Sequence, residues 1–292
     1  MCIKKILNAS VLGLVIALNA GAALAEQFVW KVPGNNGNSV YLVGSVHLLP
    51  PRAYPLPPAF EQAYKNSEIL MFETDISALE NPATQFKLLR QASYPTGETL
   101  SQSLPPPLLA SLRAATAATS LPMAMLDRFK PWFAATLIEL TAFTKAGFRP
   151  DLGVDMYFQN RAQSDGKATV GLETLDAHLA VLTDMPESLS EAYLSDTLDN
   201  LQLLETAPTE LFDYWQTGDA ESLATYVEEQ AQTNPALYAR LVDERNHAWL
   251  ADIEALLNGN ANAMVVVGAL HLAGEQGLPT LLKARGYQPV QQ

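Results

Sequence analysis

YLVGSVHLL, at Tyr41–Leu49, is the stretch around which the chain is organised, because its pattern returns near the other end as VVVGALHLA, at Val265–Ala273. In both copies an apolar, strand-favouring run meets glycine, two small or apolar residues, histidine and then leucine. Glycine at the end of a strand permits a bend or a close backbone approach, since it has no Cβ. We predict that His47 and His271 meet at the carboxyl ends of two buried strands and form half of a metal-binding hydrolytic site.

Two further runs, EILMFET at Glu68–Thr74 and ATVGLET at Ala168–Thr174, are short apolar stretches that close with Glu-Thr. Continuous apolar runs are typical of strands covered on both faces, as in parallel sheets flanked by helices. In such sheets, ligands bind beyond the carboxyl ends of the strands. The four runs end in side chains of the types that bind divalent transition metals, namely His47, Glu73, Glu173 and His271.

The remaining pattern predicts an α/β (α+β) fold with a central mixed, largely parallel sheet, flanking helices and large helical insertions. The Gly- and Asn-rich segment Pro33–Asn38 predicts that the sheet opens with an antiparallel hairpin. Helical insertions are expected within residues 81–147 and 175–230, and one long helix at Pro235–Leu257. Since a shared site would join the two ends, we expect residues 26–292 to form a single domain.

Residues 1–25 have the pattern of a secretory signal peptide. Lys4 and Lys5 precede an apolar core at Val11–Leu18, and Ala23-Leu24-Ala25 is a typical cleavage site. We therefore expect export across the inner membrane and a periplasmic location. Cys2 is the only cysteine and would leave with the signal, so the mature chain would have no disulfide, thiolate ligand or cysteine nucleophile.

The acidic composition makes two classes of partner unfavourable. The chain has 18 Lys and Arg against 31 Asp and Glu, a net charge of −13, which repels phosphate backbones and anionic lipid. Nucleic acid and membrane surfaces are therefore not expected partners, although the same charge also serves plain solubility. After the signal, no apolar run approaches the roughly 20 residues needed to span a bilayer. The motifs HExxH, G-x-S-x-G, the P-loop and a strand-linked GxGxxG are absent.

Each candidate residue also has a structural interpretation. A lone histidine is more often structural than functional, so only the repetition favours the Gly-x-x-His pair. A buried Glu73 must be paired, ligated or protonated, and it is either a metal ligand or the partner of a buried arginine. Arg245 lies mid-helix and either extends its head to solvent or points into the site as a clamp for a carboxylate or an oxyanion.

Four other polar residues are weaker candidates. Asp75 and Asp155 lie at element boundaries, where aspartate usually caps a helix. His178 and His247 lack the repeated context of the other two histidines, and we expect both to be surface or capping residues.

With these residues in view, the sequence resembles the TraB/PrgY/GumN family, which includes the Tiki metalloproteases and is similar in fold to the erythromycin-esterase and ChaN-like proteins. The resemblance covers nearly the whole mature chain. It rests on six motifs in order: GSVHLLP at Gly44–Pro50, FETD at Phe72–Asp75, GVD at Gly153–Asp155, GLET at Gly171–Thr174, ERN at Glu244–Asn246 and VGALHLAGEQGL at Val267–Leu278.

The resemblance implies His47, Glu73 and His271 as the metal site, with Glu173 and Arg245 as further active-site residues. The implied cofactor is a divalent ion, Mn, Co or Zn. Tiki proteins are membrane-anchored animal enzymes, whereas the signal predicted here is of bacterial type without an anchor, so their substrate is not carried over.

The expected function is an exported, Tiki-like metal-dependent hydrolase that acts on a peptide or a related amide. In this hypothesis Glu173 serves as general base and Arg245 stabilises the developing oxyanion. The alternative is a non-catalytic periplasmic protein that binds metal, haem or a peptide in the same cleft.

Overall fold

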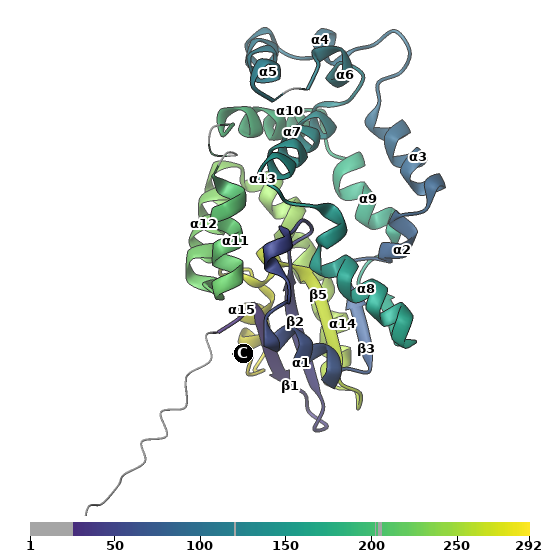
Figure 1. Ribbon diagram of the computed structural model, residues 1–292, viewed down its shortest axis with the longest axis vertical. Helices are drawn as coiled ribbons and strands as arrows, with labels where there is room; N and C mark the ends of the chain where they lie inside the picture. Colours follow the sequence, from purple (N-terminus) through teal and green to yellow (C-terminus); the bar gives the residue numbers. More distant parts are fainter. Residues whose placement is uncertain (1–25, 120, 202, 204–205) are drawn as a thin grey trace, which may run out of the picture.

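The computed structural model describes residues 26–119, 121–201, 203 and 206–292, and in that part of the chain six strands form one mixed sheet (Figure 1). The strand order is β4-β3-β5-β2-β1-β6; β4, β3, β5 and β2 are parallel, and β1 is antiparallel to both β2 and β6. The strands are β1 (Val29–Pro33), β2 (Ser39–Ser45), β3 (Ile69–Phe72), β4 (Ala168–Gly171), β5 (Ala263–Gly268) and β6 (Val290–Gln291). The predicted α/β class with a mixed, largely parallel sheet is confirmed. The predicted signal peptide lies outside the described residues.

Helices make up most of the rest of the described chain. The α-helices are α1 (Pro58–Asn66), α2 (Ile76–Leu79), α3 (Pro82–Ala92), α4 (Leu100–Ser103), α5 (Pro106–Thr119), α6 (Met123–Leu126), α7 (Pro131–Lys145), α8 (Val154–Asp165), α9 (Leu175–Thr183), α10 (Glu187–Asp199), α11 (Ala207–Thr217), α12 (Ala220–Thr233), α13 (Pro235–Tyr238), α14 (Glu244–Leu257) and α15 (Leu278–Ala284). Short 3₁₀ turns are η1 (Pro51–Ala53), η2 (Pro150–Leu152) and η5 (Ala269–Leu272). Among these helices, none is both long enough and apolar enough to cross a membrane.

The sheet opens with the predicted hairpin. β1 and β2 pair from Val29 opposite Val43 to Pro33 opposite Ser39, and Gly37 in the connecting loop has a φ of 84°. The hairpin loop is tied to the end of α14, because the Asn38 side-chain amide donates to the Leu256 carbonyl over 2.8 Å. The amino-terminal hairpin is therefore fastened to the segment that leads into β5.

The central strands are buried as predicted, but β4 is not. The apolar residues of β2, β3 and β5 lie in the main core, with Leu42, Leu70 and Val265 fully buried. β4 lies at the edge of the sheet, where Val170 is 49% exposed, so the prediction of a strand covered on both faces is wrong for this run. Its short apolar sequence does not distinguish an edge position from a central one.

A layer of helices stands over the carboxyl ends of the parallel strands (Figure 1). Helices α5, α7 and α10 pack around an apolar cluster of their own that includes Leu112, Ile138 and Leu194. This layer corresponds to the predicted helical insertions. It covers the end of the sheet at which the predicted site residues lie.

The predicted long helix Pro235–Leu257 is confirmed as a continuous helical segment with one irregularity. A π-helical stretch at Ala239–Asp243 separates α13 from α14. The apolar spacing of the sequence does not reveal the extra residue in this turn. π-turns inside helices frequently occur at functional sites, and this one lies directly before Glu244 and Arg245.

Candidate active site

The two Gly-x-x-His motifs converge on Gly268. β2 and β5 are adjacent and parallel, and Ser45 pairs with Gly268 at the end of the ladder, so both histidines lie just beyond neighbouring strand ends. A Cβ placed on Gly268 would be 3.5 Å from His271 Cδ2 and 3.9 Å from His47 Nε2. The same point is 3.3 Å from Glu73 Oε1. The two imidazoles and the carboxylate therefore surround one backbone position.

Glu73 is held from two sides. Its side chain is 11% exposed, and Oε1 accepts a 2.7 Å hydrogen bond from the Gly268 backbone N–H. Oε2 accepts from Arg245 Nη2 over 2.6 Å. Burial by itself raises the pKa of Glu73, but the neighbouring imidazoles, Arg245 and the Gly268 N–H outweigh it and hold this pKa well below its usual range. Glu73 is therefore an ionised carboxylate at neutral pH.

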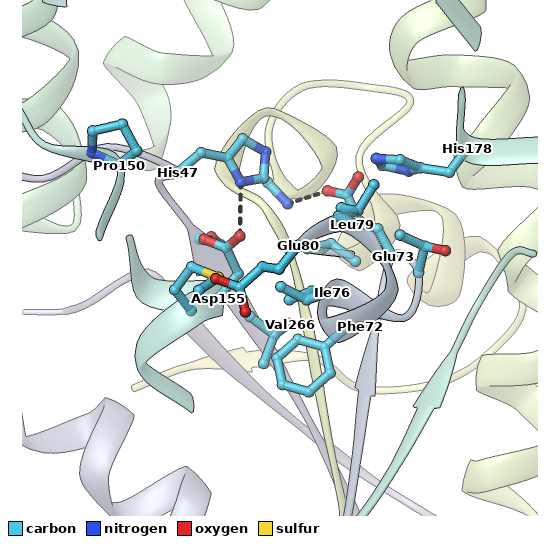
Figure 2. A pocket seen from close by; sticks show the side chains of 15 residues that line it. His47, Phe72, Glu73, Ile76, Leu79, Glu80, Pro150, Asp155, His178 and Val266 are labelled. Carbon is cyan, nitrogen blue, oxygen red and sulfur yellow. Dashed lines mark hydrogen bonds and ion pairs between the residues drawn. The ribbon is translucent and has the colours of Figure 1, made fainter. Parts of the chain in front are cut away.

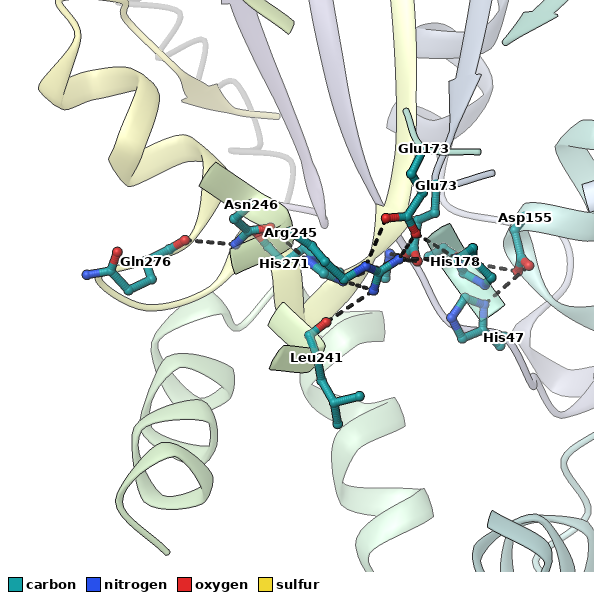
Figure 3. Close-up of polar contacts among 12 residues, drawn as sticks. His47, Glu73, Asp155, Glu173, His178, Leu241, Arg245, Asn246, His271 and Gln276 are labelled. Carbon is teal, nitrogen blue, oxygen red and sulfur yellow. Dashed lines mark hydrogen bonds and ion pairs between the residues drawn. The ribbon is translucent and has the colours of Figure 1, made fainter. Parts of the chain in front are cut away.

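Arg245 points into the site (Figure 3). Its Nη2 donates to Glu73 and also to Glu173 Oε1, each over 2.6 Å, and Nε donates to Glu173 Oε2 over 3.3 Å. Nη1 donates to the Leu241 carbonyl at 3.1 Å and lies 3.2 Å from His271 Nε2. The guanidinium packs over the Trp249 ring at 4.6 Å. Of the two interpretations open for Arg245, extension to solvent is therefore wrong, and the guanidinium binds two carboxylates of the protein itself.

The tautomer of His271 follows from its neighbours. The Asn246 side-chain amide N–H groups donate to the backbone carbonyls of His271 and Gln276, at 3.2 and 2.8 Å. The amide oxygen of Asn246 therefore faces the His271 ring. The 2.7 Å contact of His271 Nδ1 with that oxygen therefore places the proton on Nδ1. Nε2 is left as an acceptor toward Arg245. Burial lowers the pKa of His271 to about 4, and the ring is neutral at neutral pH.

His47 has a different partner. Its Nδ1 lies 3.2 Å from Asp155 Oδ2, and Asp155 Oδ1 accepts a 3.0 Å hydrogen bond from the Ser45 hydroxyl. The carboxylate of Asp155 raises the pKa of His47 above its ordinary value, although the His47 side chain is 60% exposed and water screens part of the attraction. Gly153 permits this approach, because a Cβ there would lie 2.5 Å from the His47 carbonyl oxygen.

The two weaker aspartate candidates separate in the structure. Asp155 contacts His47 and makes no side-chain cap for α8, which begins at Val154. Asp75 caps α2, where its side chain accepts from the backbone N–H groups of Ser77 and Ala78 at 3.0 and 3.3 Å. The capping interpretation therefore holds for Asp75 and not for Asp155.

His178 belongs to the site, and the prediction that it is a surface or capping residue is wrong. Its Nδ1 lies 2.7 Å from Glu173 Oε1 and 3.3 Å from Arg245 Nη2. Thr174 caps α9, so Glu173 and His178 occupy the positions before the cap and four residues after it. Apolar side chains at these two positions often pack together, and the same spacing in this sequence brings a glutamate and a histidine into contact. His247 is exposed as expected, 3.0 Å from Gln276 Oε1.

Glu173 joins Glu73, Arg245 and His178 in what we call the polar cluster. Burial alone raises the pKa of Glu173, but its hydrogen bonds with His178 and Arg245 lower it below the ordinary value. Glu73, Glu173 and His178 each offer a ligand atom, and these atoms lie within 4.8 Å of one another. The cluster opens onto a cavity of about 350 Å³ that His47, Glu73, Asp155 and His178 help to line (Figure 2).

The residue types of the predicted set, His47, Glu73 and His271, suit a divalent transition metal, but the ligand atoms that lie within 4.8 Å of one another belong to Glu73, Glu173 and His178. Imidazole and carboxylate are suitable ligands for Mn, Co and Zn. In metal sites the second nitrogen of a ligating histidine is usually held by a carboxylate or a carbonyl. Asp155 and Asn246 hold the Nδ1 atoms of His47 and His271 in this manner, leaving both Nε2 atoms as the donors. Arg245 already neutralises Glu73, so a cation would share this carboxylate with the guanidinium.

Comparisons with known proteins agree with these motifs. The model of the TraB/PrgY/gumN family matches residues 28–291. Two similar curated proteins, from Shigella flexneri and Escherichia coli (strain K12), are each named "Uncharacterized protein YbaP". Each is 26% identical over 257 residues, covering 86% of this chain and 90% of the relative. No solved structure matches.

Proposed function

This chain belongs to the TraB/PrgY/gumN family, and we propose that it is an exported, Tiki-like metal-dependent hydrolase that acts on a peptide or a related amide in the periplasm. The observation that carries the proposal is the convergence of His47, Glu73 and His271 around Gly268. Glu173 and Arg245 adjoin them. The proposal extends to a fold relationship with the erythromycin-esterase and ChaN-like proteins.

His47 Nε2, His271 Nε2 and the Glu73 carboxylate would hold the divalent ion. When bound, such an ion supplies Lewis acidity for a carbonyl oxygen and makes a neighbouring water more acidic. The protonation state of His271 suits this role, since its ring is neutral with the proton on Nδ1, but a metal ion would have to displace the Arg245 Nη1 contact from Nε2. His47 has to release a proton before it can serve as a ligand, because Asp155 favours its charged form.

Glu173 would accept the proton from the attacking water. His178, whose Nδ1 lies 2.7 Å from Glu173 Oε1, would hold this carboxylate in position, and Glu173 would then return the proton to the leaving amine. Arg245 lies between the two glutamates, and its Nη2 donates to both. It would stabilise negative charge that develops on the carbonyl oxygen of the substrate.

The first test measures metal binding. Stoichiometric Mn, Co or Zn should bind the wild type, and His47→Ala or His271→Ala should weaken this binding by ~100-fold or more, since each removes a ligand. Isothermal titration calorimetry and elemental analysis measure this loss. His247→Ala is the matched control, because it removes an exposed histidine outside the cluster. Equal binding in all four proteins would remove the proposed metal site.

The second test measures turnover. With saturating metal, a fluorogenic peptide library should be hydrolysed, and Glu173→Gln should lower kcat by roughly 10²- to 10⁴-fold, the usual contribution of a general base. The variant should retain its metal, because Glu173 is not one of the three proposed ligands. Loss of turnover together with the metal would instead assign Glu173 to the ligand set.

One observation favours the non-catalytic alternative. Arg245 already satisfies one oxygen of Glu73 and both oxygens of Glu173, so the cluster is electrostatically complete without a bound cation. A protein that binds metal, haem or a peptide without reaction would tolerate such an arrangement. Absence of any turnover under saturating Mn, Co and Zn would favour this alternative.

A further inference from the structure

The cavity beside the polar cluster has apolar walls (Figure 2). Phe72 and Val266 lie at the ends of adjacent strands, Ile76 and Leu79 come from α2, and Met156 comes from α8. Ile76 and Leu79 are three positions apart and therefore share one face of their helical turn. The Asp75 cap stabilises this turn. Phe72, Ile76 and Leu79 of the apolar wall and the candidate ligand Glu73 thus lie on one continuous segment of the chain, from β3 to α2.

We propose that this cavity is the subsite for an apolar side chain of a peptide substrate, next to the amide presented to His47 and Glu73. The inference rests on the proposed function and adds a substrate class to it. A volume of about 350 Å³ is ample for a branched aliphatic or an aromatic side chain. Transfer of such a side chain from water onto these walls is favourable in proportion to the apolar area buried.

Charged side chains are poorly suited to this cavity. Two carboxylates of its lining are already occupied, since Asp155 accepts from Ser45 and contacts His47, while Glu73 accepts from Gly268 and Arg245. The third, Glu80, is exposed to solvent and would attract a lysine side chain only weakly. An acidic side chain would meet these carboxylates as like charges, and the His47 ring is already paired with Asp155.

Thr74 favours a peptide over a hydrocarbon chain. It lines the cavity, its side chain is buried, and its hydroxyl has no hydrogen-bond partner within the described part of the chain. A buried polar group without a partner is costly. The amide of a bound peptide can supply this partner after a small adjustment, whereas a fatty acyl chain cannot.

The test compares N-acetylated tetrapeptide amides that differ at one position, which carries leucine, phenylalanine, aspartate or lysine. Binding to the full wild-type chain is measured in a chelator, so that no hydrolysis intervenes, and turnover is measured separately with Mn, Co or Zn. The leucine and phenylalanine peptides should bind ~10-fold or more tightly than the charged ones, the discrimination typical of an apolar pocket. Equal affinity across the series, or no binding, would overturn the inference.

Matched variants locate the subsite. Leu79→Glu should weaken binding of the leucine peptide by ~10-fold or more. Leu89→Glu, on the neighbouring α3 where the side chain is 45% exposed, should leave binding unchanged. Circular dichroism checks the fold of both, and Leu79→Ala, which only enlarges the cavity, should shift the preference from leucine toward phenylalanine. The same affinity in Leu79→Glu, Leu79→Ala and the wild type would overturn the assignment of this wall.

Thr74→Val tests the choice of a peptide. It should weaken peptide binding and leave the affinity for decanoate unchanged. Decanoate bound more tightly than every peptide would overturn the inference in favour of a lipid. A clear apolar preference without any turnover would contradict the proposed hydrolase and support the subsite. Turnover without a preference would contradict the subsite alone.

Discussion

The two Gly-x-x-His copies end neighbouring parallel strands, yet their imidazoles lie in opposite surroundings. The His47 side chain is 60% exposed and contacts the carboxylate of Asp155, whereas the His271 side chain is 6% exposed and contacts the neutral amide of Asn246. The pKa of His47 is therefore raised and that of His271 lowered. The motif places a ring at a strand end, and the partner of that ring determines its charge.

This difference gives the two histidines separate tasks. His271 packs against Trp249, with ring centroids 4.6 Å apart, and lies beside Arg245, so it is a buried imidazole that is neutral at neutral pH. His47 faces the cavity and can exchange protons with solvent. The same sequence motif therefore supplies one imidazole that is neutral at neutral pH, His271, and one that exchanges protons with solvent, His47.

The largest effect should come from Arg245, which contacts His271 and not His47. Arg245→Met leaves Glu73 and Glu173 buried without their cation and should cost about 3–5 kcal/mol of unfolding free energy, as when a buried ion pair loses one partner. Urea denaturation measures this cost. Arg285→Met is the control, because the Arg285–Glu254 pair is well exposed, and its loss should cost less than about 1 kcal/mol.

The pH dependence of the same variant sharpens this test. In the wild type the pKa values of Glu73 and Glu173 are lowered, so their stabilisation is present above the ordinary carboxyl pKa and is lost as the pH falls through the lowered values. Without Arg245, both pKa values should rise from their lowered values, and the variant should lose less stability than the wild type as the pH falls. An unchanged pH profile would contradict the assigned role of Arg245.

The motif glycines should give an intermediate effect and differ from each other. A Cβ on Gly44 would lie 2.8 Å from Phe28 Cδ1, in the fully buried core, so Gly44→Ala should cost about 1–3 kcal/mol through overpacking. A Cβ on Gly268 meets Glu73 and His271 at 3.3 and 3.5 Å, and Gly268→Ala should mainly disturb the site. Thermal unfolding and metal titration together distinguish the two, and equal stability losses would contradict this division.

The smallest effect is expected when the polar partners of the His47 and His271 rings, Asp155 and Asn246, are exchanged. In metal-free protein, Asp155→Asn should move the pKa of His47 down toward 6.5, and Asn246→Asp should raise the pKa of His271 from about 4. Ring-proton NMR titration of His47 and His271 measures both shifts. If neither ring responds, the partners do not determine the charge.

Much of the fold could be predicted from the pattern of residues within short segments. The hairpin, the central strands and the polar residues that close them follow from apolar runs and turn residues, which are properties of short segments. The prediction that β4 is covered on both faces is wrong because a four-residue apolar run has the same sequence pattern at the edge of a sheet as in its centre. The π-turn before Arg245 was missed because one extra residue in a helix barely changes the spacing of its apolar side chains.

The site was predicted less completely than the fold. The convergence of His47, Glu73 and His271 could be anticipated, because parallel strands end at one edge of a sheet. His178 was not anticipated, since it carries no repeated motif, although its distance from the Thr174 cap places it beside Glu173. Their roles in metal binding and catalysis remain predictions for the experiments above.

Local sequence alone settled which segments become strands and which polar side chain ends each of them, because strand formation and side-chain alternation depend on adjacent residues. The folded chain had to assemble before Asp155 could reach His47, or Asn246 and Arg245 could reach His271, since these partners are distant in sequence. Charge state depends on burial and on those partners. Two nearly identical motifs therefore acquire opposite protonation behaviour only in the assembled molecule.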